Sequence, residues 1–369
     1  MLGTNKPFFL VAGARPNFIK LAPLVWALRK RTDLPFQIIH TGQHYDFAMS
    51  EVFFQTLAIP QPDINLEVGS GSQATQTARI LERFENLLLE RPPQAVVVFG
   101  DVNSTLACSL AAAKLQIPVV HVEAGLRSFD RSMPEEINRI VTDLLSDLLL
   151  VSEPSGLANL SREGISPAKC HLVGNIMIDT LAQMMPAALE RATPVRFGLQ
   201  PGGYALLTMH RPSNVDQPDT LRRLLDLFGE LSIELPVVFP VHPRTRKLMQ
   251  EVGFPAGAYP HFHLIEPVDY LDSLCLQKQA RLLLTDSGGM QEESTYLSIP
   301  CITLRQNTER PVTVDEGTSV LVGNDPLMIR QAFSDVMSGH FKRGRKIPYW
   351  DGCTAERIAG ILAENLLTC

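Results

Sequence analysis

Short apolar segments of four to six residues recur along the whole chain, with helical patterns between them. These segments are 8–12, 36–40, 95–99, 118–122 and 148–151, then 204–208, 237–241, 281–285 and 301–304. A strand with one solvent-exposed face alternates polar and apolar residues, whereas these segments are apolar nearly throughout and rich in Val, Ile, Leu and Phe. We therefore expect strands buried on both faces, in parallel sheets that helices cover.

Helical patterns occupy the intervals between these strands. They span 17–31, 104–115, 134–147, 176–192, 220–231, 290–297 and 326–337. Because the alternation of strand and helix runs twice, we expect the α/β class, with two doubly wound parallel-sheet domains. A stretch rich in Pro and Gly follows the 176–192 helix, and we place the boundary between the domains near residue 175.

Composition argues against several classes of protein. The 369 residues include 39 acidic and 33 basic side chains, a net charge of -6, which argues against a nucleic-acid or anionic-membrane partner. The six cysteines are scattered without a CxxC pair, which indicates a reducing compartment, so we expect a cytoplasmic protein. We find neither a run of 18 apolar residues nor a signal-peptide pattern, and expect no membrane association.

The motifs of common metal and cofactor sites are missing from the sequence. It contains no HExxH, no carboxylate-rich calcium loop and no GxxxxGK[ST], and the first strand leads into GARPNFIK rather than GxGxxG. His261 and His263 alternate ahead of an expected strand, where an exposed loop is a better interpretation than a metal pair. We therefore expect no metal, no NAD and no other cofactor.

Polar clusters follow nearly every expected strand. They are GAR (13–15), TGQH (41–44), GD (100–101), HVEAG (121–125), MHR (209–211), HPR (242–244), DSGG (286–289) and Arg305. In open α/β sheets, ligands bind beyond the carboxyl ends of the strands. A purely structural sheet needs turns there, but not this supply of Arg, His, Asp and Glu. We therefore expect the ligand site in a cleft between the two domains.

Asp101, Glu123 and Glu135 are candidates for proton transfer. A carboxylate directly after a buried strand is well placed for it, because burial tunes its pKa. For Asp101, a turn or a helix cap is nearly as good an interpretation. Glu123 stands in a short turn where a helix-capping role is a weaker interpretation, which favours a functional role. Glu135 and Glu136 follow Pro134, where first-turn acids complement the helix dipole without catalysis.

The segment 286–289 stands between a strand and a helix. Glycine allows close backbone approach, and a helix N-terminus offers free N–H groups to phosphate, although Ser or Asp there can equally cap the helix. With Arg15, His210 and Arg244 at equivalent strand ends, a diphosphate ligand is the better account.

Seven motifs occur together in one order. They are GARPNFIK (13–20), HTGQHYD (40–46), GDVNST (100–105), HVEAGLRS (121–128), MPEEINR (133–139), TDSGGMQEE (285–293) and NTERP (307–311). Across the whole chain the sequence resembles the non-hydrolysing UDP-N-acetylglucosamine 2-epimerases. The resemblance implies two Rossmann-like domains of the GT-B type, here 1–175 and 176–352, with the C-terminal helix of 353–369 packed back on the first. It also implies a homodimer and a role in polysaccharide biosynthesis.

The resemblance also implies roles for individual residues. Acid–base roles fall on Asp101, Glu123 and Glu135, with His210 as a further catalytic residue. The expected substrate-binding residues are Arg15 and Lys20, Ser287, Gly288 and Gly289 around phosphate, Glu293 on the ribose hydroxyls, His242 and Arg310. Many bacterial relatives bind a second substrate molecule as an activator, and the positions that match this allosteric site are Gln43, His44 and Glu136, together with His242.

The implied reaction interconverts UDP-N-acetylglucosamine and UDP-N-acetylmannosamine. The proton at carbon 2 has no adjacent carbonyl, and no NAD fingerprint supports oxidation of a neighbouring alcohol. Elimination of UDP to a 2-acetamidoglucal, followed by protonation from the opposite face and return of UDP, needs two acids that one carboxylate cannot supply. The chain departs from the usual family pattern after His210, where Arg-Pro-Ser-Asn replaces Arg-Glu-Asn, and residues 69–73 do not clearly preserve the activator site.

Four alternatives stay open. The same chemistry on UDP-2,3-diacetamido-2,3-dideoxyglucuronic acid fits RSFDRSMPEEINR and HTGQHYDFAMSEVFF, whereas TERP favours the N-acetylglucosamine enzyme. A hydrolysing epimerase would release free N-acetylmannosamine, and a GT-B glycosyltransferase would pass the sugar to an acceptor. A catalytically inactive UDP-sugar-binding regulator is the fourth, and the intact acids argue against it.

Overall fold

The computed structural model describes residues 6–43 and 53–366, and the chain divides into two compact units. Unit 1 comprises Met1–Thr180 with Pro348–Cys369, and unit 2 comprises Leu181–Ile347. The expected domains were 1–175, with a returning segment 353–369, and 176–352. In the described part of the chain, no helix is long and apolar enough to cross a membrane.

Unit 1 is built on a seven-stranded parallel sheet in the order β3-β2-β1-β4-β5-β6-β7. Its strands are β1 (Phe8–Ala12), β2 (Phe36–His40), β3 (Ile64–Asn65), β4 (Val96–Phe99), β5 (Val119–Ala124), β6 (Leu148–Val151) and β7 (Cys170–Leu172). The sheet order runs outward in both directions from the β1–β4 pair. This doubly wound topology is typical of nucleotide-binding domains.

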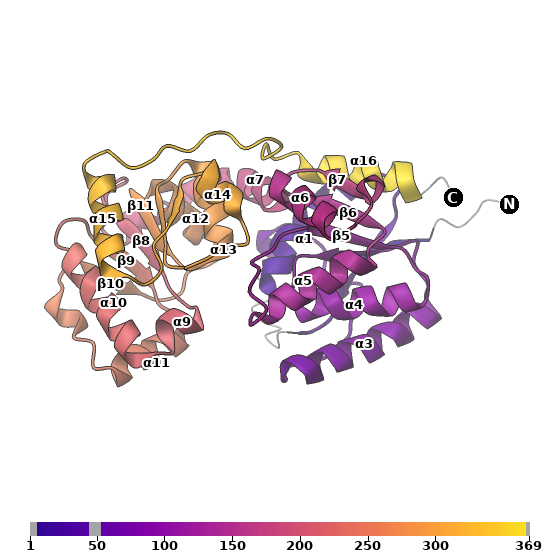
Figure 1. Cartoon of the computed structure of the whole chain (residues 1–369), viewed down its shortest axis with the longest axis horizontal. Coiled ribbons are helices and arrows are strands. Elements are labelled where there is room, and N and C mark those ends of the chain that lie inside the picture. Colours follow the sequence, from indigo (N-terminus) through magenta and orange to yellow (C-terminus); the bar gives the residue numbers. More distant parts are fainter. Residues whose placement is uncertain (1–5, 44–52, 367–369) are drawn as a thin grey trace. The chain divides into compact units, whose positions relative to one another are not determined.

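Helices cover both faces of this sheet. They are α1 (Arg15–Leu28), α3 (Gln73–Glu90), α4 (Asn103–Lys114), α5 (Pro134–Leu145), α6 (Pro154–Arg162), α16 (Thr354–Leu366) and α7 (Ile176–Glu190), in which the two units meet along the chain. Helices α3, α4 and α5 lie side by side along one face, and α16 packs against α1 on the other (Figure 1). Small buried residues of α4, such as Ala107 and Ala111, let it lie close to the sheet and to both neighbouring helices.

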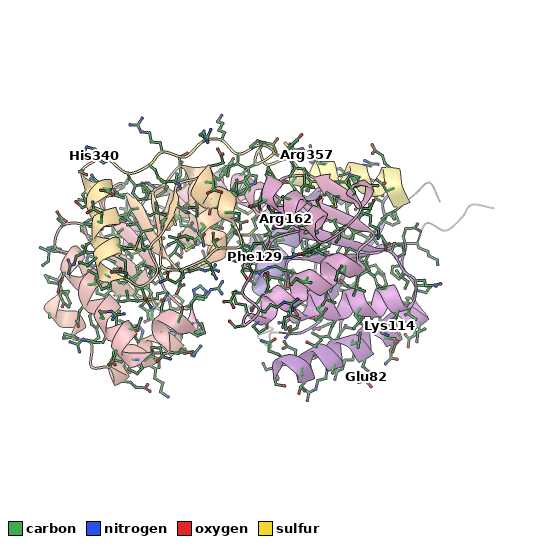
Figure 2. All side chains as sticks on the ribbon, in the orientation of Figure 1. Glu82, Lys114, Phe129, Arg162, His340 and Arg357 are labelled. Atoms are coloured by element: carbon green, nitrogen blue, oxygen red, sulfur yellow. The ribbon has the colours of Figure 1, made fainter. Side chains whose placement is uncertain are left out.

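The C-terminal helix belongs to unit 1 although more than 160 residues of unit 2 precede it. Arg357 in α16 donates a 2.8 Å hydrogen bond to the carbonyl of Val173 (Figure 2). Gln94 donates one of 2.6 Å to the carbonyl of Leu366 at the other end of the helix. These bonds fasten both ends of α16 to the first unit.

Unit 2 repeats the topology with a six-stranded parallel sheet in the order β10-β9-β8-β11-β12-β13. Its strands are β8 (Ala205–Thr208), β9 (Val237–Pro240), β10 (Phe262–Ile265), β11 (Leu282–Thr285), β12 (Cys301–Thr303) and β13 (Ser319–Leu321). Here the order runs outward from the β8–β11 pair. The expected α/β class with two doubly wound parallel-sheet domains is confirmed.

The helices of unit 2 also form two layers. They are α8 (Thr193–Arg196), α9 (Pro212–Val215), α10 (Pro218–Leu231), α11 (Pro243–Glu251), α12 (Tyr270–Gln279), α13 (Gly288–Leu297), α14 (Pro311–Asp315) and α15 (Pro326–Met337). Successive residues of β8 enter different cores: Ala205 and Leu207 join the cluster under α10 and α15, whereas Leu206 joins the one under α12. A strand that feeds two cores must be apolar throughout, which explains the sequence pattern.

Some elements were missed or misread in the sequence. The most direct correction concerns His263, which lies in β10 and not in a loop, while His261 precedes the strand. Helix α3 was overlooked although Ile80, Phe84 and Leu87 form its buried stripe. Strands β3 and β13 were also missed, because two or three residues carry too little pattern to detect.

Candidate functional site

The centre of unit 1 lies where its sheet order reverses, beyond the carboxyl ends of β1 and β4. Asn17 joins the two strand ends: its Oδ1 accepts the backbone N–H groups of Gly13 (3.3 Å) and Ala14 (3.1 Å), and its Nδ2 donates to the carbonyl of Phe99 (2.9 Å). The polar residue in the GARPN turn therefore has a structural role, as it fixes the two strand ends that flank the candidate site.

Lys20 and Glu123 form a buried ion pair at this point. Nζ of Lys20, in α1, lies 2.6 Å from Oε2 of Glu123, in β5, and the side chains are 7% and 3% exposed. A Cβ atom on Gly100 would lie 2.7 Å from the same Nζ, so glycine at the end of β4 leaves room for the ammonium group. In the structure Lys20 contacts a candidate catalytic carboxylate, and its predicted contact with the diphosphate or the sugar stays a prediction.

The backbone of Glu123 is unusual for a strand residue. Its φ is +74°, in the left-handed region that non-glycine residues seldom occupy, and the β5–β6 register shifts between Val122 and Ala124. Such a bulge redirects a side chain out of the regular alternation. A strained backbone of this kind commonly accompanies function, which agrees with the interpretation of Glu123 as an active residue.

Asp101 is held by two residues of α5. Its Oδ2 accepts hydrogen bonds from Nε (2.9 Å) and Nη2 (2.6 Å) of Arg139, and its carbonyl accepts one of 2.8 Å from Asn138. The carboxylate stays 22% exposed, so a ligand can reach it. Asp101 is thus a partly open carboxylate that a buried guanidinium orients, and the helix-cap interpretation does not account for these contacts.

Glu135 and Glu136 are adjacent but differ sharply in environment. Glu135 is half-buried in the first turn of α5. Glu136 is buried and accepts hydrogen bonds from the N–H groups of Ser128 (2.9 Å) and Phe129 (2.9 Å) and from Arg139 (2.7 Å). Burial opposes the ionisation of Glu136, but these donors outweigh it and lower its pKa. Its carboxylate therefore serves the internal structure of the motif.

Three further predicted residues belong to the first unit. Gln43 is buried, and its Oε1 accepts hydrogen bonds from the N–H (3.2 Å) and the hydroxyl (2.7 Å) of Ser104. Arg15 begins α1, at the carboxyl end of β1. His44 lies outside the described residues. The allosteric role of Gln43, His44 and Glu136 stays a prediction.

In unit 2, His210 and Asp286 lie together where the sheet order reverses, after β8 and β11. Asp286 is fully buried and accepts the backbone N–H of His210 (3.0 Å) and of Arg211 (2.9 Å) and the side-chain amide of Asn214 (3.0 Å). Its Oδ1 also lies 3.0 Å from Nδ1 of His210, whose side chain is 59% exposed. Burial would raise the pKa of Asp286, but His210 and these donors outweigh it and lower the pKa.

The segment Ser287-Gly288-Gly289 opens helix α13. Ser287 occupies the N-cap position, but its side chain makes no capping hydrogen bond. The side chain of Ser287 therefore does not occupy the first-turn N–H groups of α13. A helix terminus that binds phosphate needs such N–H groups to be available. A Cβ on Gly288 would meet Nη1 of Arg310 at 2.7 Å, so this glycine makes room for a buried arginine.

Arg310 is buried in a charge network. Its Nε lies 2.9 Å from Oε1 of Glu292, and its Nη1 pairs with Glu309. Glu309 also receives Arg305, 2.7 Å from Nη2 to Oε2. The guanidinium lies against Gly288 at the start of α13, and the predicted role of Arg310 in ligand binding stays a prediction.

Glu293 and His242 complete the predicted set in unit 2. Glu293 accepts a 2.8 Å hydrogen bond from Gln277 and lies 3.4 Å from the hydroxyl of Tyr270. Its burial, with the charge of Glu292 nearby, raises its pKa to about 7. His242 is the exposed N-cap residue of α11 and accepts the N–H of Arg244 at 3.3 Å, and the Arg244 guanidinium pairs with Asp216 (2.7 Å).

The family model of UDP-N-acetylglucosamine 2-epimerases matches residues 26–363. The chain belongs to this enzyme family. The chain is 43% identical over 362 residues to the UDP-N-acetylglucosamine 2-epimerase of Methanocaldococcus jannaschii, across 96% of this chain and 98% of that protein. The crystal structure of the M. jannaschii enzyme in complex with UDP-N-acetylglucosamine and UDP has a TM-score of 0.89, at 41% identity, and covers 97% of this chain and 100% of that one.

A relative named for a different substrate is nearly as similar. The UDP-2,3-diacetamido-2,3-dideoxy-D-glucuronate 2-epimerase of Pseudomonas aeruginosa is 40% identical over 358 residues, across 96% of this chain and 98% of that protein. Sucrose-phosphate synthase of Thermosynechococcus elongatus, at 13% identity and a TM-score of 0.62, shares the fold alone. The family resemblance and the assignment as an enzyme are confirmed.

The sequence reasoning missed several residues that hold the predicted site residues within each unit. Arg139 and Asn138 hold Asp101, Asp286 orients His210, and Glu292 with Glu309 surrounds Arg310. A signal existed for Arg139 and Asn138, which stand in the quoted MPEEINR motif. For the other contacts, the partners are distant in sequence and meet through the fold.

Proposed function

We propose that this protein interconverts UDP-N-acetylglucosamine and UDP-N-acetylmannosamine by eliminating and re-adding UDP. The observation that carries the proposal is the set of carboxylates in unit 1. Asp101 is fixed by a guanidinium yet open to ligand, and Glu123 is aimed by a β-bulge and paired with Lys20. An inversion at carbon 2 needs one group to remove a proton and another to deliver one on the opposite face.

In the elimination step, a carboxylate takes the proton from carbon 2 of the sugar. The electron pair of that C–H bond forms a double bond between carbons 1 and 2, and UDP leaves carbon 1 with the electrons of the C–O bond. A second carboxyl group then protonates carbon 2 from the opposite face, and UDP returns to carbon 1. We assign the proton transfers to Asp101, Glu123 and Glu135.

The departing UDP carries additional negative charge on its diphosphate. Fixed cations and N–H donors lower the barrier when they face the oxygen atoms on which charge develops. In unit 2 we assign this task to the N–H groups at the start of α13 and to His210, which Asp286 orients. Glu293, buried beside Gln277 and Tyr270, is assigned to the ribose hydroxyls.

A second candidate is the same reaction on UDP-2,3-diacetamido-2,3-dideoxyglucuronic acid. The 40% identity to the P. aeruginosa relative favours it nearly as much as the 43% identity to the M. jannaschii enzyme favours the first. The two substrates differ at carbons 3 and 6 and share the reacting carbons 1 and 2, so the same acids serve both.

The test is to incubate the purified protein with UDP-N-acetylglucosamine in heavy water and to follow carbon 2 by NMR. UDP-N-acetylmannosamine with deuterium at carbon 2 is the expected product. Free N-acetylmannosamine with UDP would overturn the proposal in favour of hydrolysis. No reaction, combined with turnover of the diacetamido uronate, would establish the second candidate instead.

Site variants connect that reaction to the named residues. Asp101→Asn, Glu123→Gln and Glu135→Gln should each lower turnover by about a hundred-fold or more while UDP binding stays within a few-fold. Glu82→Gln, an exposed residue of α3 (Figure 2), is the matched control and should leave turnover unchanged. Near-normal turnover in any of the three would remove that residue from the mechanism.

We also propose that the protein is a homodimer, and the outer face of α5 supports this. The buried residues of α5 are polar, among them Glu136, Arg139 and Asp143, whereas Ile137 and Leu144 are 49% and 58% exposed. A helix on the surface of a monomer normally presents the reverse pattern. Phe129, just ahead of the helix, adds a side chain that is 73% exposed (Figure 2).

An apolar face of this kind is suited to burial against a second copy of the chain. Leu144→Asp should convert the protein to monomers in sedimentation velocity. Leu327→Asp is the matched control, because Leu327 is 77% exposed at the start of α15 in unit 2. A monomeric wild type, or a dimer that Leu327→Asp disrupts and Leu144→Asp does not, would overturn the assignment.

A further inference from the structure

His121 is a fully buried histidine of β5 with an acceptor at each ring nitrogen. Its Nδ1 lies 2.6 Å from Oδ1 of Asp143, in α5, and its Nε2 lies 2.8 Å from the carbonyl oxygen of Gly100, after β4. The sequence reasoning gave no role to His121 or Asp143. Together they connect the strand that carries Glu123 with the turn that carries Asp101.

The two acceptors determine the protonation state of the ring. A backbone carbonyl can only accept, so Nε2 must carry a hydrogen. Oδ2 of Asp143 lies 2.7 Å from Nη1 of Arg127 and accepts the backbone N–H of Gly125 at 3.0 Å; both groups can only donate, and the guanidinium charge favours the ionised carboxyl. Asp143 is therefore a carboxylate, which also only accepts, so Nδ1 carries a hydrogen as well and the ring is an imidazolium.

The surrounding charges are consistent with a cationic ring. Nη1 of Arg127 lies 2.7 Å from Oδ2 of Asp143, and its other nitrogens bind both oxygens of Glu163 at 2.8 and 2.6 Å. With a cationic His121, this group balances two carboxylates with two cations. A cationic ring gives the buried Asp143 carboxylate a second charged donor beside Arg127, whereas Glu163 reaches solvent.

The ring acts on the peptide that leads into Asp101. Carbonyl and N–H of a trans peptide point in opposite directions, so fixing the Gly100 carbonyl also fixes the N–H of Asp101. Gly100 has a φ of +63°, and its freedom without a side chain makes such a restraint useful. Arg139 and Asn138 hold the rest of Asp101, its carboxylate and its own carbonyl.

We propose that His121, as an imidazolium held by Asp143, is a positioning residue that fixes the Gly100–Asp101 peptide and with it the Asp101 carboxylate relative to Glu123. The proposal rests on the proposed function, in which Asp101 and Glu123 transfer protons. It assigns the HVEAG segment two tasks: Glu123 acts on the substrate, and His121 sets the place of another acid.

The first test needs no substrate and no variant. Nitrogen-15 NMR of the wild-type protein, with the ring of His121 assigned through its backbone, should show hydrogens on both nitrogens at neutral pH. A ring with one unprotonated nitrogen would overturn the imidazolium and, with it, the proposed positioning role of His121. This measurement stands whether or not the protein turns over UDP-N-acetylglucosamine, so it separates failure of this inference from failure of the proposed function.

The second test separates positioning from mere stability. His121→Gln should lower kcat by about ten- to a hundred-fold with KM within a few-fold, because a small displacement of a catalytic group has effects of this size. Glu163→Gln is the matched control: it weakens the contacts of Glu163 with Arg127 at the outer end of the same network but touches none of Asp143, Gly100 and Asp101. Its thermal stability should fall, while kcat of the folded protein stays within a few-fold of wild type.

Equal losses of kcat in the two variants would overturn the proposal, since the network would then act only through stability. Normal kcat in His121→Gln would overturn it as well. If neither variant folds, Asp143→Asn supplies the readout. Loss of the carboxylate should leave His121 with one ring hydrogen in the NMR spectrum. A ring that stays doubly protonated would contradict the proposal that Asp143 holds His121 as an imidazolium.

Discussion

Asp179 in α7 accepts a 2.7 Å hydrogen bond from the backbone N–H of Ala355, in the first turn of α16. Asp179, near the middle of the chain, thus caps helix α16. Burial of Asp179 outweighs the donors at that helix terminus and raises its pKa to about 6. The folded protein therefore favours the protonated carboxyl group of Asp179 overall, although the N–H donors of the helix terminus by themselves favour the carboxylate.

The stability of unit 1 should consequently depend on pH through Asp179. The folded pKa of about 6 exceeds the ordinary value of 3.8, so the contribution of Asp179 to stability is fully present below pH 3.8 and is lost as the pH rises to about 6. Asp179→Asn keeps an acceptor that never ionises. Its stability advantage over wild type should grow by about 1 kcal/mol between pH 5 and pH 8.

Urea denaturation followed by tryptophan fluorescence measures this directly. The two tryptophans, Trp26 and Trp350, both lie in unit 1, so the signal reports on the unit that contains the cap. A constant difference between the two proteins at both pH values would contradict the assigned pKa.

The Lys20–Glu123 pair gives a second prediction. Lys20→Met leaves a buried carboxylate without its ammonium partner and should lower the free energy of unfolding by about 3–5 kcal/mol. Lys20→Met/Glu123→Gln should recover part of that loss, because the uncompensated charge is gone. Lys30→Met is the control, since the Lys30–Glu356 pair is exposed and spans 3.6 Å, and should change stability by less than about 1 kcal/mol. Simple additivity in the double variant would show that the pair does not couple.

Glu293 gives a prediction about ligand affinity. Its pKa of about 7 means that the free protein is partly protonated there at neutral pH, whereas ribose hydroxyls donate best to the ionised form. UDP affinity should therefore fall as the pH drops from 8 to 6, by about tenfold for this group. Calorimetric titration of wild type and Glu293→Gln at both pH values isolates the effect, because UDP's own ionisation is common to both. Parallel pH profiles would exclude Glu293 from the ribose site.

His210 and Asp286 should behave as one unit in turnover. Asp286→Asn cannot accept all the donors that converge on the carboxylate and should misplace the His210 ring. We expect Asp286→Asn and His210→Asn each to lower kcat by about a hundred-fold, and the double variant to be little worse than either. Multiplicative losses, measured by steady-state kinetics on the same substrate, would mean that the two residues act independently.

The strand scaffold could be predicted from the sequence because its strands are buried on both faces. The segments 8–12 and 148–151 match β1 and β6 to the residue, and each feeds apolar side chains to both sides of its sheet. Strand β13, of three residues, and strand β10, which His263 interrupts, were not predicted, because each carries too little pattern to separate from a loop. A strand could thus be predicted from the sequence where it is buried on both faces.

The positions of the candidate acids were also predictable, but their environments were not. Asp101 and Glu123 end or follow buried strands, which the sequence shows directly. The +74° backbone of Glu123 coincides with a register shift against β6, and the contacts of Asp101 come from α5. Such features depend on how distant segments meet, on which a single sequence carries no direct signal.

Helix α5 has one further consequence. It carries Glu135, holds Asp101 through Arg139 and leaves Ile137 and Leu144 facing outward. If a second copy of the chain covers that outer face, the same helix both positions the acids and forms the contact between protomers. Specific activity would then depend on enzyme concentration and fall when the protein is diluted below the dimer dissociation constant. Initial rates measured over a dilution series would therefore report on the oligomeric state.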